Sequence, residues 1–179
     1  IKDVVFLAIM SAVALATCAV MPLVISLQPL IFGISQLVTA LQIGVFFAIG
    51  LYKVRKPGSL LIMALMMGLI QLMMSPPMFL SSVLNGILIE LIVLLLFRGY
   101  EKDAAVFCAA MLHTPLSLPF NYLYNRLIKG ADSPLAAVAD RAPLAAVGMT
   151  LAVVAVSALG ALIGIKIARE LKKSGVLKK

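Results

Sequence analysis

Residues 4–52 read VVFLAIMSAVALATCAVMPLVISLQPLIFGISQLVTALQIGVFFAIGLY and contain no Asp, Glu, Lys or Arg. A soluble domain needs charged side chains to solvate its surface, so a stretch of this length indicates a bilayer environment. A bilayer core about 30 Å thick is crossed by a helix of about 20 apolar residues. The stretch therefore predicts two crossings, joined by a bend around Pro22 and Pro29.

The composition of the whole chain agrees with this interpretation. Hydrophobic residues make up 63% of the 179 residues, charged residues make up 12%, and the mean hydropathy is +1.14. These values are typical of an all-α polytopic membrane protein, and we expect a single bundle without a separate soluble domain. The apolar segments and their proline and glycine boundaries predict six transmembrane helices, at about 4–25, 30–52, 59–75, 77–97, 103–126 and 143–168.

The basic residues predict the topology of the six helices. Twelve of the 15 lysines and arginines fall in one alternating set of connections and ends, whereas the other set holds only Arg126, Lys129 and Arg141. By the positive-inside rule both termini are cytoplasmic. The net charge of +8 forms no basic stripe interleaved with aromatic residues, which argues against a nucleic-acid partner.

Small residues recur on the first predicted helix, where Ala8, Ala12 and Ala16 follow one another at every fourth position. In lipid, small residues at this spacing let a second helix approach closely. The stripe is either an internal packing surface of the bundle or a docking face for a separate membrane subunit. Gly160 and Gly164 form a similar pair on the last helix, and there we expect internal packing.

Glu90 is the one formal charge inside a predicted span. A carboxylate in the membrane is costly, and it faces the bundle interior or a partner. Gly86 lies on the same helical face and Asn85 is offset from it. Glu90 is therefore a candidate functional residue together with Asn85, or a structural hydrogen-bonding group.

The fifth predicted helix is the most polar. Pro115 follows His113 and Thr114 near mid-membrane, where a proline bends the helix. Towards the outer face, Asn121 shares a helical face with Asn125 and with Tyr124. These side chains suit a small, uncharged, polar or heteroaromatic ligand. With two glutamines near the same mouth, the candidate substrate-binding residues are Gln28, Gln36, Asn85, Glu90, His113, Asn121, Tyr122, Tyr124 and Asn125. The polar loop at 127–142 is either a lid over this mouth or a plain connector.

Catalytic and metal-binding motifs are missing from the sequence. The chain has a single histidine, no HExxH motif, and no Ser or Cys in a nucleophile motif. Cys18 and Cys108 fall in apolar stretches without metal-ligand spacing, which is typical of buried thiols. We therefore expect no enzyme activity, no metal and no cofactor. Because the sequence has no Walker A motif, uphill transport would draw its energy from elsewhere.

Several motifs occur together in this chain: the Ala8-x-x-x-Ala12 stripe, the stretch from Ile43-Gly-Val-Phe-Phe to Arg55-Lys-Pro-Gly58, Pro76-Pro77, Asn85-Gly86 with Glu90, and the ending Ala168–Lys173. With the six predicted spans, they resemble the S components of energy-coupling factor (ECF) transporters. The resemblance covers most of residues 3–125, is closest to the YkoE-like and MptD-like groups, and implies the plasma membrane of a prokaryote.

The resemblance implies a substrate-binding membrane subunit that captures a vitamin-like micronutrient or its precursor from outside. A thiamin or hydroxymethylpyrimidine type of substrate is the first expectation. It also implies that the alanine motif docks onto a membrane T subunit, and that two cytoplasmic ATPases supply the energy. Two alternatives remain open: a self-sufficient ion-coupled secondary transporter that uses Glu90 and His113, and a membrane assembly subunit without a transport function.

Overall fold

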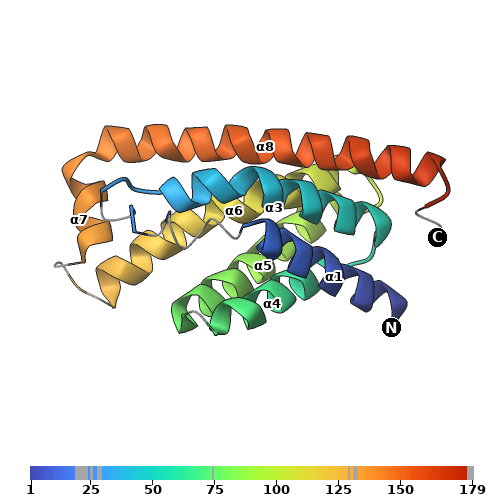
Figure 1. Ribbon diagram of the computed structural model, residues 1–179, viewed down its shortest axis with the longest axis horizontal. Coiled ribbons are helices and arrows are strands. Elements are labelled where there is room, and N and C mark those ends of the chain that lie inside the picture. The colour runs from blue at the N-terminus through green and yellow to red at the C-terminus, as the bar shows by residue number, and fades with distance from the viewer. Residues whose placement is uncertain are drawn as a thin grey trace.

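The protein folds as a bundle of α-helices (Figure 1). The computed structural model describes residues 1–18, 24, 26–27, 30–73, 75–128, 130 and 133–176, and every regular element in these ranges is helical. The helices are α1 (Lys2–Thr17), α3 (Ile34–Lys53), α4 (Ser59–Leu72), α5 (Pro76–Phe97), α6 (Asp103–Leu127), α7 (Pro134–Arg141) and α8 (Pro143–Lys173).

The predicted helix boundaries agree with the observed ones for five of the six segments. The first predicted segment, 4–25, corresponds to α1 as far as Thr17, and positions 19–23 and 25 lie outside the described residues. The main difference is α7, a short helix inside the segment 127–142 that we expected to be a loop. Pro134 and Pro143 stand at the first turns of α7 and α8, where a proline lacks only an amide that the helix does not use.

Three of the described helices are long and apolar enough to cross a membrane, namely α3, α5 and α8. Helix α4 is apolar but has only 14 residues, and α1 has 16. Large apolar side chains also cover the outside of the bundle, including Leu95, Leu144 and Leu151, which are 81%, 88% and 65% exposed. An exterior of this kind is expected in contact with lipid. The number of crossings stays a prediction.

Ion pairs connect basic turns and helix ends at the end of the bundle where α1 begins and α8 ends (Figure 1). Asp103 at the start of α6 pairs with Arg55 of the α3–α4 turn at 2.5 Å and with Arg169 of α8 at 2.6 Å. Lys56 pairs with Asp3 of α1 at 2.6 Å. We call this the basic end. Helix α7 lies at the opposite end (Figure 1).

Helix α3 packs closely against α8, because glycines of α8 face its backbone. A Cβ atom on Gly160 would lie 2.4 Å from the carbonyl oxygen of Leu41, and one on Gly164 would lie 2.4 Å from that of Val45. No side chain fits at these distances without a shift of the helices. The pair is thus an internal packing surface, as expected from its spacing.

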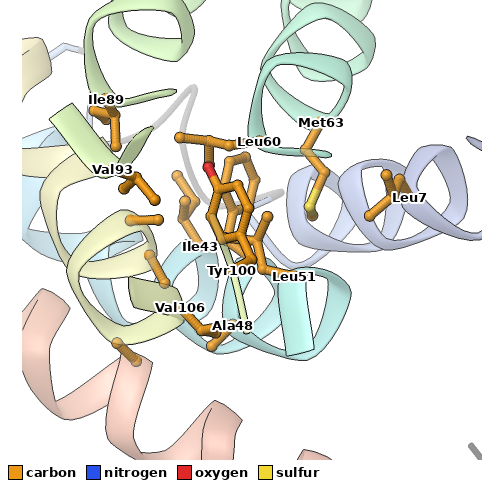
Figure 2. Close-up of a cluster of buried hydrophobic side chains, with 14 of the residues drawn as sticks. Leu7, Ile43, Ala48, Leu51, Leu60, Met63, Ile89, Val93, Tyr100 and Val106 are labelled. Atoms are coloured by element: carbon orange, nitrogen blue, oxygen red, sulfur yellow. The ribbon is translucent and has the colours of Figure 1, made fainter. Parts of the chain in front are cut away.

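A buried apolar cluster fills the bundle towards the basic end (Figure 2). Tyr100 lies in this cluster, close to Leu51 and Leu60, and is fully buried. Its hydroxyl donates a hydrogen bond of 2.9 Å to Oε2 of Glu90, while the backbone amide of Gly58 donates one of 2.6 Å to Oε1. Burial and the Glu90 carboxylate raise the pKa of Tyr100 above its ordinary value, so the phenol keeps its proton. Glu90 therefore joins two turns to helix α5.

Candidate functional site

A cavity of about 380 Å³ opens between α1, α3, α4, α5 and α6, and the residues just before and at the start of α7 line its edge. Its volume lies in the range of small-molecule sites. The described residues of the lining include polar side chains from several helices and no Asp, Glu, Lys or Arg. The described lining residues can thus form hydrogen bonds with a ligand, but none of them is an Asp, Glu, Lys or Arg that would neutralise the charge of an ionic ligand.

Most of the predicted substrate-binding residues come together in this cavity. Helix α3 contributes one, α5 contributes one and α6 contributes four, in the order Gln36, Asn85, His113, Asn121, Tyr124 and Asn125. These residues are far apart in the sequence. Their convergence on one cavity is the main structural support for a binding site here.

Two of the predicted residues are placed differently, and a third lies outside the described residues. Glu90 does not belong to the described lining, and both of its oxygens accept hydrogen bonds, from Gly58 and Tyr100. Tyr122 also lies outside the lining and donates a hydrogen bond of 2.7 Å to Asp140 of α7. Gln28 lies outside the described residues. Glu90 and His113, the expected pair for an ion path, share no hydrogen bond, since neither ring nitrogen of His113 has a partner among the described residues.

The part of α6 around Pro115 lines the inner part of the cavity. Pro115 has no backbone amide, which frees the carbonyl of Met111 one turn earlier. Ser157 of α8 donates a hydrogen bond of 2.8 Å to that carbonyl. The side chain of Asn85 on α5 is oriented with its amide nitrogen towards the carbonyl of Leu116. It donates a hydrogen bond of 3.3 Å to that carbonyl and accepts one of 3.3 Å from the backbone amide of Ser117. Side chains of α8 and α5 thus form hydrogen bonds with backbone groups of α6 near Pro115, as buried polar groups require.

The α7 end of the cavity is tied to α6 by polar side chains. Asn125 accepts a hydrogen bond of 2.9 Å from Ser133 and donates one of 2.8 Å to the carbonyl of Asn121. Arg126 forms an ion pair of 3.1 Å with Asp140 of α7. Ser133 and Pro134 line the cavity. The segment 127–142 therefore reaches the mouth of the cavity, which is the placement that a lid requires.

The inner wall of the cavity carries His113 and Thr114. Their side chains are only 5% and 3% exposed. Both ring nitrogens of His113 and the hydroxyl of Thr114 are without a hydrogen-bond partner among the described residues. The ring of Phe47 lies against the imidazole, with 4.4 Å between the ring centroids and a tilt of 48°. Two adjacent residues of the cavity lining thus bury polar atoms that have no partner among the described residues, which is unusual in a folded protein.

Several polar residues of the lining were not among the candidates predicted from the sequence, chiefly Ser35, Thr39, Gln71, Ser82 and Thr114. Small hydroxyl side chains are common in membrane helices, where they bond to the backbone of their own helix, so they give a weak signal. Thr39, for example, donates a hydrogen bond of 2.9 Å to the carbonyl of Ser35. The spacing of Ser35 and Thr39 on the face next to Gln36 was the signal available.

The alanine stripe of α1 turns away from the bundle. Ala8 is half-buried, whereas Ala12 and Ala16 are exposed. The core-facing side of α1 consists of Leu7, Ser11 and Ala14. Among the described residues, therefore, the outer part of the stripe has no internal partner helix to pack against.

The apolar exterior and the helices long enough to span a bilayer are typical of an integral membrane protein, and its bundle contains a cavity of small-molecule size. The chain belongs to a family of hypothetical bacterial integral membrane proteins, Trep_Strep, whose model matches residues 1–173. No curated protein and no solved structure matched the chain. The family membership establishes a bacterial integral membrane protein.

Proposed function

We propose that this protein is the substrate-binding S component of an ECF-type importer. The observation that carries the proposal is the cavity of about 380 Å³ inside an apolar helical bundle, lined by six residues that the sequence analysis had selected. A cavity of this size holds a small metabolite. The exposed alanine stripe on α1 supports a second expectation, a face for a separate membrane subunit.

The proposed substrate is a neutral, vitamin-like micronutrient or precursor. The described lining offers amides, hydroxyls, an imidazole and a phenol, and it has no ionised side chain. Burying an ionic ligand there would leave its charge uncompensated, which is costly. A neutral hydroxymethylpyrimidine therefore suits the cavity better than thiamin, which carries a fixed positive charge.

The proposed partners are a membrane T subunit and two cytoplasmic ATPases. In this arrangement the S component binds substrate from outside, and ATP hydrolysis by its partners drives release to the inside. The T subunit would contact Ala8, Ala12 and Ala16, because small side chains let helices pack closely in lipid.

We further propose six crossings, with the basic end in the cytoplasm and α7 outside. The test uses single cysteines at two exposed positions, Lys102→Cys at the basic end and Ala142→Cys beside α7, in a chain without Cys18 and Cys108. An impermeant thiol reagent applied to intact cells should label the residue at 142 and not the one at 102. Labelling of both, or of 102 alone, would contradict this topology.

Native mass spectrometry of the purified protein tests the substrate-binding role. We expect a fraction of the molecules to carry one neutral small molecule, held by the hydrogen-bonding side chains of the cavity. A cavity-blocking variant, Ser117→Trp on the α6 wall, should lose this mass. If no small molecule from a bacterial extract binds the wild type, or if the retained mass is unchanged in the variant, the cavity is not the substrate site.

A further inference from the structure

Two groups stand out among the polar side chains of the described cavity lining. In the first group the protein itself supplies the partner. Ser82 donates a hydrogen bond of 2.9 Å to the carbonyl of Ala64, and Ser117 donates one of 2.7 Å to the carbonyl of Thr114. Asn85 and Asn125 are engaged through their amides. These side chains maintain the shape of the cavity, and only spare hydrogen-bonding capacity is left for a ligand.

The second group consists of His113 and Thr114, whose polar atoms have no partner among the described residues. A buried hydrogen-bonding group without a partner is destabilising, and each such group in a native structure needs an explanation. Both residues belong to the cavity wall and are adjacent in the chain. The three polar atoms are closed to a water-sized molecule in this structure, so a ligand in the cavity supplies the missing partners once the two side chains turn towards it.

We infer that His113 and Thr114 determine the specificity of the site, and that its ligand is a neutral molecule carrying a hydrogen-bond donor next to an acceptor. This inference rests on the proposed function and narrows its substrate class. A neutral imidazole has one donor and one acceptor nitrogen, and a threonine hydroxyl can act as either. An edge with both kinds of group, as in an aminopyrimidine, a cytosine or a carboxamide, complements this pair. A purely accepting or apolar edge leaves one of them unsatisfied.

The binding test uses three neutral probes: 4-amino-5-hydroxymethyl-2-methylpyrimidine, cytosine and nicotinamide. Each is compared with its N,N-dimethyl analogue, in which the amino or amide nitrogen has lost its N–H donors. We expect at least one probe to bind the protein in detergent about tenfold or more tightly than its analogue, because a site built to hydrogen-bond a group rejects the molecule that lacks it. If no probe binds, or if every probe that binds does so no more tightly than its analogue, the inference is overturned.

Two variants test the residues themselves. Thr114→Val removes the unpartnered hydroxyl with little change of shape, and His113→Phe replaces the imidazole with an apolar ring. Each should weaken binding of the best probe about 5- to 100-fold. The midpoint of thermal unfolding without probe should stay the same or rise for Thr114→Val, because no existing hydrogen bond is lost. A lower midpoint with unchanged affinity would show that the hydroxyl is structural.

Thr150→Val is the matched control. Thr150 lies on α8 outside the described lining, and its hydroxyl already donates a hydrogen bond of 2.8 Å to the carbonyl of Ala146. The control should leave the affinity for the probe unchanged. The result also separates this inference from the proposed function. A retained molecule that is charged or lacks the donor–acceptor edge would overturn the inference and leave the substrate-binding role intact.

Discussion

Replacing Ala12 with Trp is expected to abolish assembly with a membrane partner while the chain still folds and binds its substrate. Ala12 is exposed on the side of α1 that turns away from the core, so the bundle can accommodate an indole there. A second helix that packs against the alanine stripe cannot, because close approach in lipid depends on small side chains. Co-purification of tagged variants from bacterial membranes measures the loss.

Val13→Trp is the control for this prediction. Val13 is 36% exposed and belongs to the same helix, but it lies on the other flank, off the stripe of every fourth residue. We expect this variant to assemble normally. Normal assembly of both variants would assign the stripe to lipid contact, and loss of assembly in both would indicate a general effect on α1.

Replacing Glu90 with Leu is expected to produce a large loss of stability. The fully buried hydroxyl of Tyr100 would lose its acceptor, which costs about 1–3 kcal/mol. The amide of Gly58 would lose its partner as well, and with it the contact between the α3–α4 turn and α5. The midpoint of thermal unfolding in detergent should fall clearly.

Two further variants assign the effect of Glu90. Tyr100→Phe removes one of the two hydrogen bonds, and a double-mutant cycle with Glu90→Leu isolates the energy of that pair. Glu90→Gln keeps an acceptor for Gly58 and should be milder. Because Glu90 lies outside the described lining, Gln at this position should leave probe affinity unchanged. A clear loss of affinity with an intact fold would return Glu90 to the binding site.

Much of the bundle could be predicted from the sequence, because membrane helices are recognised by their length and apolar composition. Prolines and glycines marked the helix boundaries, as at Gly58, whose φ of 86° is unfavourable for other residues, directly before α4. Helix α7 escaped prediction because its eight residues are bracketed by Pro134 and Pro143 and resemble a polar loop.

The candidate site was predictable in part, for a physical reason. Polar residues on a mostly apolar helix are costly in lipid and so draw attention, as Asn121 and His113 did. The residues that a side chain contacts in the fold could not be predicted in this way. Glu90 meets Tyr100 and Gly58, which belong to two turns, and helical spacing contains no information about such contacts. Thr114 stood out only once the structure placed its hydroxyl without a partner.

The central claim is that this bacterial membrane protein is the substrate-binding subunit of a multi-subunit importer. Purification of the tagged wild-type chain from native membranes in mild detergent, followed by identification of the accompanying proteins, tests it most directly. The account predicts that a membrane T subunit and two ATPases co-purify with the wild type and are absent from the Ala12→Trp preparation. Isolation of the wild-type chain without any ATPase, under conditions that preserve a known membrane complex from the same cells, would contradict it.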